Sequence, residues 1–315
     1  MASDALVTGA PDALVVDGLT RRFGARVAVE DLRLRVRPGD VYGFLGPNGA
    51  GKTTAIRCML GLIGRDSGHV SIFGEADPVA QRRHVGAMVE TPAFHPWMSG
   101  RDNLRRAVAF SGVAAGRVDV NAALARVGLA GREGDRVGTY SLGMKQRLGI
   151  ARALVGEPRL LLLDEPTNGL DPRGMKEVRD LLGELARRDR LTIFLSSHLL
   201  NEVEQLCTRV GILDRGRLVA EGTPQELADR LRGGGEELEV GASDLSALGA
   251  ALRTIGGVHL VGDGDGGRLR VRLEGLSAAD LNLALVAAGV RVQALVPIVH
   301  RLEDLFLSLT SQELT

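Results

Sequence analysis

The sequence predicts an α/β domain followed by a smaller α+β domain. In the first part, strand-like and helix-like segments alternate, which is typical of a sheet covered by helices. The unalternating apolar run Leu160–Leu163 fits a strand buried on both faces of such a sheet. Three consecutive glycines at 233–235 mark a linker. We therefore expect a flexible N-terminus over residues 1–12, the α/β domain over 13–232 and the α+β domain over 236–315.

Short apolar runs between polar or glycine-rich segments define the expected elements of the first domain. The tripeptide Asp214-Arg215-Gly216 separates its last two strands and is a hairpin signal. We expect strands over 13–16, 32–36, 41–45, 160–163, 191–195, 210–213 and 217–219, helices over 52–60 and 177–187, and a helix-rich stretch over 100–128.

The second domain has its own pattern of apolar segments. The expected order is strand, helix, strand, strand, helix, strand, over residues 237–240, 245–255, 258–261, 268–273, 277–288 and 290–295. This is the order of the ferredoxin-like arrangement. A last amphipathic helix is expected over 302–309. The domain contains no motif that carries chemistry, so we interpret it as a regulatory or dimer-stabilising appendage.

Composition narrows the class of protein and its location. The 315 residues are 44% hydrophobic and carry a formal net charge of zero, unlike a strongly basic nucleic-acid-binding domain. Two cysteines indicate a reducing compartment. No run approaches the roughly 18 apolar residues of a membrane span, and the first residues do not resemble a signal peptide. We expect a cytosolic protein with no nucleic-acid partner.

A glycine-rich loop stands between a predicted strand and a predicted helix and matches the pattern G-x-x-x-x-G-K-[ST]. The loop consists of Gly46, Pro47, Asn48, Gly49, Ala50, Gly51, Lys52, Thr53 and Thr54. Its glycines let backbone N–H groups face a phosphate, and the start of the helix adds partial positive charge. Lys52 can reach the β- and γ-phosphates, and Thr53 can bind Mg²⁺ through its hydroxyl.

A lysine in this loop is informative because only three of the 39 basic residues are Lys. A compact ammonium fits a phosphate slot better than a guanidinium does. A chance lysine in a glycine-rich turn is the alternative, and the strand–loop–helix context argues against it.

An acidic pair, Asp164 and Glu165, follows the apolar run Leu160–Leu163 directly. A buried strand that ends in carboxylates places them at the carboxyl edge of a sheet, where α/β proteins bind ligands. Asp164 is suited to hold Mg²⁺, and Glu165 is suited to act on an attacking water. Alone, such a pair is more often a solvated turn. Together with the phosphate loop, it indicates nucleoside triphosphate hydrolysis.

Further segments resemble the motifs of ABC ATPases in their order along the chain. Residues 140–147, Tyr-Ser-Leu-Gly-Met-Lys-Gln-Arg, resemble the signature L-S-G-G-Q-x-Q-R, with Ser141 and Gly143 in place. Asp171, in Gly-Leu-Asp, is similar to the D-loop aspartate, and His198 to the switch histidine. Phe23 stands where the family places an aromatic residue that stacks on adenine. Taken singly, Phe23 could equally be a core aromatic and His198 a structural histidine.

The resemblance implies both fold and activity. The implied fold has a RecA-like core, an antiparallel β subdomain and an α-helical subdomain. The implied activity is ATP hydrolysis, with ATP and Mg²⁺ bound, for a transporter whose membrane-spanning permease is a separate chain. Lys52, Glu165 and His198 take the catalytic roles. The implied partners are a second ATPase subunit, whose signature closes over the γ-phosphate, and the permease, which holds the protein at the cytoplasmic face of the membrane.

Three positions depart from the family pattern. Leu142 replaces a signature glycine and Met144 the signature glutamine. Glu90 stands where the family usually has a glutamine that touches both Mg²⁺ and the permease. Glutamate is also an oxygen ligand, so Glu90 joins Thr53 and Asp164 as a predicted metal residue. It resembles the residue of ATPases in bacitracin and lantibiotic export and immunity systems, which favours export.

The segment after Glu90, residues 91–99, is the predicted permease contact. Phe94 and Trp97 give it an apolar character that is unusual for a surface loop. The alternative is that both rings pack inside the helical subdomain.

Other functions remain open from the sequence. One is a soluble ABC ATPase that acts on the ribosome or DNA, although those proteins carry two ATPase domains or a long coiled coil. An importer ATPase is another. A non-catalytic subunit is disfavoured because Lys52, Asp164, Glu165 and His198 are all present.

Overall fold

A computed structural model describes residues 11–113, 117–231, 236–264, 266–298 and 306. The chain forms two compact units, Met1–Pro224 and Gln225–Thr315, and each is described by itself. The expected flexible N-terminus, the glycine linker over 233–235 and the last amphipathic helix lie outside the described residues, apart from residues 11, 12 and 306.

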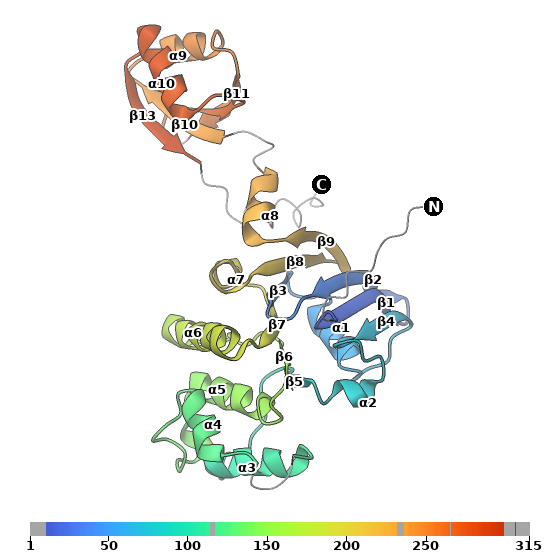
Figure 1. Cartoon of the computed structure of the whole chain (residues 1–315). Coiled ribbons are helices and arrows are strands. Elements are labelled where there is room, and N and C mark those ends of the chain that lie inside the picture. Colours follow the sequence, from blue (N-terminus) through green and yellow to red (C-terminus); the bar gives the residue numbers. More distant parts are fainter. Residues whose placement is uncertain (1–10, 114–116, 232–235, 265, 299–305, 307–315) are drawn as a thin grey trace. The chain divides into compact units, whose positions relative to one another are not determined.

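A six-stranded sheet forms the centre of the first unit (Figure 1). Its order is β5 (Val85–Met88), β6 (Leu160–Leu163), β7 (Thr192–Ser197), β3 (Val41–Leu45), β8 (Arg209–Asp214) and β9 (Arg217–Gly222). The first five strands are parallel and β9 is antiparallel to β8. Every residue of β3, β6 and β7 is buried, as the unalternating apolar runs predict. The carboxyl ends of β3, β6 and β7 therefore lie side by side.

A second, antiparallel sheet packs in the same unit, with β1 (Leu14–Phe23) between β2 (Arg26–Val36) and β4 (Ser67–Ser71). Its apolar side chains join the core of the unit. The sequence predicted only 13–16 and 32–36 as strands here, which is too short. The missed parts are mixtures of polar and apolar residues, in which buried Leu19 and Val29 alternate with half-exposed neighbours, and cross-strand pairing extends the strands through them.

The helices of the first unit are α1 (Lys52–Met59), α2 (Pro78–Gln81), α3 (Gly100–Phe110), α4 (Val120–Arg126), α5 (Leu142–Ala153), α6 (Pro172–Asp189) and α7 (Leu200–Leu206), with a short 3₁₀ turn at Val137–Thr139. Helices α3, α4 and α5 pack together as one group (Figure 1). Helix α6 begins at Pro172, earlier than the predicted start at 177, because Asp171 caps it and proline is favoured in the first turn.

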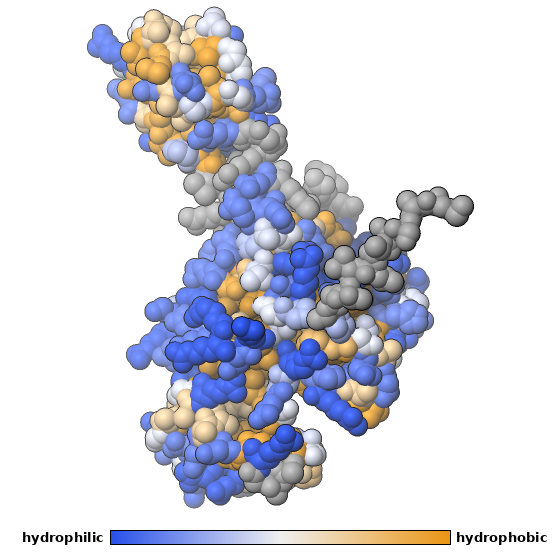
Figure 2. Space-filling model, viewed as in Figure 1, coloured by the Kyte–Doolittle hydropathy of each residue, from blue (hydrophilic) through white to orange (hydrophobic). Residues whose placement is uncertain are grey.

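The second unit contains six elements beyond α8 (Pro224–Leu231), which begins at the division between the units. They are β10 (Glu236–Ala242), α9 (Leu245–Leu252), β11 (Val258–Gly264), β12 (Arg268–Leu273), α10 (Ala278–Ala287) and β13 (Val292–Pro297). The sheet order is β11-β12-β10-β13, with every pair antiparallel. Its inner face and both helices enclose a core of their own. Apolar residues are also visible on the surface of this unit (Figure 2).

None of the helices in the described ranges combines the length and the apolar character that crossing a bilayer requires.

Because the two units have separate hydrophobic cores, we expect deletion of residues 236–315 to leave a folded ATPase unit. The truncated chain should keep a cooperative thermal transition by circular dichroism and should bind ATP in titration calorimetry with unchanged affinity. Insoluble protein, or loss of the transition, would show that the first unit needs the second to fold.

Candidate functional site

The phosphate loop joins β3 to α1 and is tightly enclosed by neighbouring backbone. A Cβ on Gly46 would lie 2.4 Å from the carbonyl oxygen of Leu213, and one on Gly51 would lie 2.2 Å from that of Ala28. Gly51 also has a φ of +106°, which favours glycine. Only glycine fits at these two positions, so the loop's path depends on them.

Lys52 is buried inside this loop, with 6% of its surface exposed. Its Nζ donates to the carbonyl oxygens of Gly46, at 2.7 Å, and Pro47, at 3.3 Å. It also lies 3.2 Å from Oε1 of Glu165. The ammonium is therefore held where the loop opens, and a phosphate oxygen can replace one of these oxygens as its partner.

Asp164 connects the loop to the sheet. Its carboxylate accepts hydrogen bonds from Thr53 Oγ1, at 2.7 Å, and from Ser196 Oγ, at 2.6 Å. Ser196 in turn accepts from the N–H of Glu165, at 2.9 Å. Sequence reasoning did not identify Ser196 as a site residue. The available signal was a pair of serines at the end of a buried strand, directly before His198.

Glu165 lies between the other two predicted catalytic residues, Lys52 and His198. Its Oε2 is 2.7 Å from Nδ1 of His198, and its Oε1 faces Lys52. Glu165 has a φ of +49°, a strained conformation for a residue with a side chain. The structure thus brings Lys52, Glu165 and His198 into direct contact, and it holds the glutamate by partners on both oxygens.

These side chains line a cavity of about 490 Å³, here called the phosphate-loop cavity. Phe23 lies in its wall, 49% exposed, with the Arg21 guanidinium 4.6 Å from the ring centre. Phe23 is therefore not a core aromatic. Arg26 and Asn168 also line the cavity and carry no sequence signal that singles them out.

Ser141, Gly143 and Asp171 line a different cavity, of about 410 Å³, here called the signature cavity. The Ser141 hydroxyl caps α5 and accepts from the N–H of Met144, at 3.2 Å. Asp171 caps α6 and accepts from the N–H of Gly174, at 2.8 Å. Within one chain, the signature residues and the phosphate loop line two different cavities that share no lining residue.

The structure pairs Glu90 with a partner other than Thr53 or Asp164. It has a φ of +65° and forms an ion pair with Arg57 of α1, and within the described ranges it has no hydrogen bond to either predicted metal residue. Its predicted role at the metal stays a prediction.

The oxygen atoms of Thr53 and Asp164 fit Mg²⁺, which prefers few protein ligands and completes its shell with water and phosphates. Among the described residues, no group of three or more His, Cys, Asp or Glu side chains is placed to hold a metal alone. A magnesium ion here would need the oxygens of a bound nucleotide.

Comparison with known proteins agrees with this geometry. A model of the ABC transporter family matches residues 29–168, which include the phosphate loop and the Asp164–Glu165 pair. The chain is 41% identical over 294 residues to the bacitracin transport ATP-binding protein BcrA of Bacillus licheniformis, covering 92% of this chain and 95% of that one. The chain belongs to the ABC transporter ATP-binding subunits.

A second relative matches nearly the whole chain, and a solved structure matches about the length of the ABC ATPase unit. The daunorubicin resistance ATP-binding protein DrrA3 of Streptomyces coeruleorubidus is 35% identical over 313 residues, covering 96% of this chain and 98% of that one. A solved structure of an ATP-binding subunit of an ABC transporter is 30% identical, with a TM-score of 0.62, covering 70% of this chain and 93% of that one. The predicted ABC ATPase fold and ATP hydrolysis by a transporter subunit are confirmed.

Replacing Glu165 with glutamine tests its role directly. The Glu165→Gln side chain keeps its size but loses the charge that faces Lys52 and His198. We expect kcat to fall by about 10²–10⁴-fold, the usual contribution of a general base, with ATP affinity retained. Phosphate release and nucleotide titration measure the two quantities.

Glu184→Gln on the exposed side of α6 is the matched control and should keep full activity. Wild-type turnover in Glu165→Gln would remove Glu165 from the catalytic step.

Proposed function

We propose that two copies of this subunit bind Mg-ATP between them and drive the export of a drug or antimicrobial peptide through a separate permease. The observation that supports it most is the separation of the phosphate-loop cavity from the signature cavity within one chain. A second chain can place its signature residues over the phosphate-loop cavity of the first. The relatives named for bacitracin transport and daunorubicin resistance support export over import.

The proposed chemistry assigns one task to each side chain. Lys52 exchanges a loop carbonyl for phosphate oxygens and offsets their charge as the γ-phosphoryl group leaves. Thr53 and Asp164 would hold Mg²⁺, which, when bound, neutralises further phosphate charge. Glu165 accepts a proton from the attacking water, and His198 keeps its carboxylate oriented. Phosphoryl transfer needs positioning and charge stabilisation more than covalent catalysis, and this site offers both.

The signature cavity of the second chain would complete the site. Ser141 and Gly143 lie at the start of α5, where N–H groups carry partial positive charge that favours a phosphate. A Cβ on Gly143 would meet Gly174 and Leu170 at 3.9 Å, which is ordinary van der Waals contact, so no backbone blocks the approach of a nucleotide to the half-buried glycine. ATP would then hold two subunits together until hydrolysis releases them.

The permease contact is proposed for residues 91–99. Trp97 is 67% exposed, so it is not buried inside the helical group. Phe94 is half-buried, and the Arg152 guanidinium lies 5.2 Å from its ring centre. Exposed aromatic side chains of this kind often anchor a protein interface. Because Glu90 directly precedes the segment, nucleotide binding near α1 can be transmitted to it. The permease in turn would keep the subunit at the cytoplasmic face of the membrane.

The second unit is proposed as a regulatory or dimer-stabilising appendage. Leu283 and Val286 of α10 are 69% and 59% exposed, and Leu260 and Val261 of β11 are 44% and 47% exposed. A contiguous exposed apolar patch often marks a contact with another protein, and we propose these side chains as part of such a contact.

Mixing two inactive variants tests the shared site. Lys52→Ala disables the phosphate loop of one chain, and Gly143→Asp places a carboxylate in the signature cavity of the other. Each variant alone contains only defective sites, whereas a mixed dimer has one site with Lys52 and the facing Gly143 both intact. We therefore expect ATP hydrolysis to reappear on mixing, measured as phosphate release at saturating ATP.

Different affinity tags on the two chains verify that mixed dimers form. Absence of any recovered activity in verified mixed dimers would contradict a site built from two chains.

A Phe94→Ala, Trp97→Ala double variant tests the permease contact. We expect the purified subunit to keep its melting temperature and ATP affinity but to lose co-purification with its permease, because each aromatic anchor can contribute about 2 kcal/mol or more to an interface. Phe110→Ala, which removes another exposed aromatic ring, is the control and should still co-purify. A large drop in the melting temperature of the double variant would instead assign these rings to the core.

A further inference from the structure

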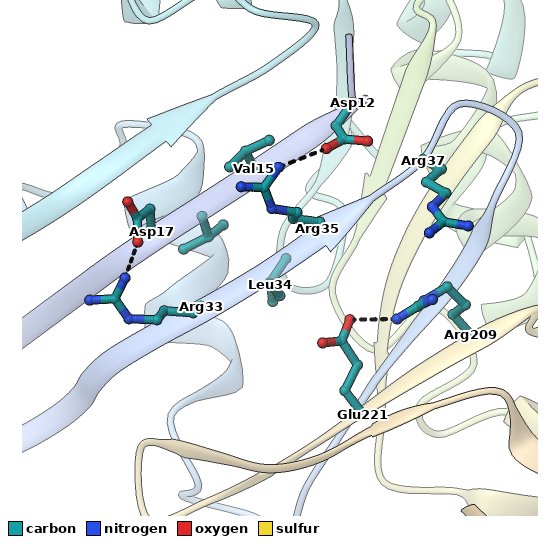
Figure 3. A pocket seen from close by; sticks show the side chains of 10 residues that line it. Asp12, Val15, Asp17, Arg33, Leu34, Arg35, Arg37, Arg209 and Glu221 are labelled. Atoms are coloured by element: carbon teal, nitrogen blue, oxygen red, sulfur yellow. Dashed lines mark hydrogen bonds and ion pairs between the residues drawn. The ribbon is translucent and has the colours of Figure 1, made fainter. Parts of the chain in front are cut away.

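The first unit contains a second, larger cavity of about 730 Å³ (Figure 3). Its walls come from β1, β2, β8 and β9 and the residues beside them, and it shares no lining residue with the phosphate-loop cavity. We call it the arginine cavity, because Arg33, Arg35, Arg37 and Arg209 all line it. Nothing in the proposed ATPase cycle uses these residues.

Side chains along β2 and the residue after it point alternately to opposite faces, which places three of the arginines on one face. Leu34 and Val36 point into the core, with 3% and 0% of their surfaces exposed. Arg33, Arg35 and Arg37 therefore lie together on the outer face, since successive side chains of an extended segment point to opposite sides. Arg209 joins them from the start of β8, so four positive charges surround one cavity (Figure 3). Such an arrangement repels itself unless anions compensate for it.

Protein carboxylates compensate for only part of this charge. Arg33 is paired with both Asp17 and Asp31. Arg35 has one long contact, 3.4 Å from Asp12. With respect to the part of the chain that the structure describes, its side chain therefore keeps most of its N–H donors free of protein acceptors.

The remaining two guanidinium groups are less well satisfied. Arg209 contacts Glu221 at 3.3 Å, but among the described residues its buried Nε has no hydrogen-bond acceptor. Glu221 is shared, because it also accepts from the hydroxyl of Tyr42, at 3.1 Å. In the described part of the chain, the Arg37 guanidinium has neither an ion pair nor a hydrogen bond. The exposed Arg37 guanidinium is therefore available to an anion that enters the cavity.

We propose that Arg35, Arg37 and Arg209 bind a phosphate-bearing anion in the arginine cavity. Guanidinium groups present paired N–H donors that match phosphate oxygens, and these charge-assisted bonds are among the stronger ones in proteins. A bound phosphate would provide the counter-charge that the arginines beside the cavity lack. The cavity is larger than inorganic phosphate needs, so it suits a phosphate ester, either of a soluble metabolite or of an anionic lipid headgroup.

Pyrophosphate titration tests the proposal on the full chain. Saturating Mg-ADP first occupies the phosphate-loop cavity, so that any remaining heat of binding comes from elsewhere. We expect an additional pyrophosphate site whose affinity falls as salt rises. An Arg35→Gln, Arg37→Gln double variant should weaken it by about tenfold or more, because charge-assisted hydrogen bonds are lost.

Two exposed arginines provide the matched control. An Arg82→Gln, Arg83→Gln double variant removes the same charge from another surface of the unit and should bind pyrophosphate like the wild type. The Arg35 and Arg37 side chains are exposed, so their variant should keep its melting temperature and its ATP hydrolysis. These readouts make a failure of this site distinguishable from a failure of the ATPase proposal.

Vesicle flotation separates the two sources of phosphate. Binding to vesicles that contain phosphatidylglycerol, but not to phosphatidylcholine vesicles, together with loss in the Arg35→Gln, Arg37→Gln variant, supports a lipid headgroup. Pyrophosphate binding without vesicle binding supports a soluble phosphate ester. The proposal is overturned if the wild type binds neither probe, or if the double variant binds both as well as the wild type does.

Discussion

The hydrogen bonds to one buried carboxyl group, that of Asp164, hold the candidate site together. A polar group at the end of a buried strand is stable only when hydrogen bonds replace the water it has lost. Thr53 provides one from α1, and Ser196 provides one from β7. Because Ser196 also accepts from the N–H of Glu165, the position of the glutamate depends on the same cluster. The phosphate loop, the acidic pair and the neighbouring strand are thereby fixed to one another before any nucleotide binds.

The signature cavity depends on a different physical requirement, the capping of the first turns of α5 and α6. Ser141 and Asp171 each satisfy a backbone N–H that the helix itself leaves unpaired. Capping therefore fixes both side chains at a surface. Leu142, which departs from the family pattern, approaches Gly169, where a Cβ would lie 3.3 Å from its Cδ2. The leucine side chain is accommodated against the glycine of the D-loop.

Because Glu90 is charged, Arg57 and a magnesium ion can compete for its carboxylate, whereas a neutral glutamine would not form the ion pair. As a carboxylate, Glu90 pairs with Arg57 of α1, the helix that also begins with Lys52 and Thr53. A magnesium ion that drew Glu90 toward it would have to break that ion pair. Exposed ion pairs contribute little stability, so replacing Arg57 by a metal ion as the partner of Glu90 would cost little free energy. The pair thus couples the phosphate-loop helix to the start of the proposed permease contact.

The sequence by itself determined the chemistry and the core strands. The phosphate loop, the acidic pair and the apolar runs of β3 and β6 are local patterns, because their physical requirements act within a few residues. Spacing alone could not place His198 against Glu165, Ser196 against Asp164, or the arginines of β2 beside Arg209. Those contacts join segments far apart in the chain, and only strand pairing brings them together. The separation of Ser141 from Lys52 was likewise decided by the tertiary structure, because helix packing directs α5 to a different surface from the loop.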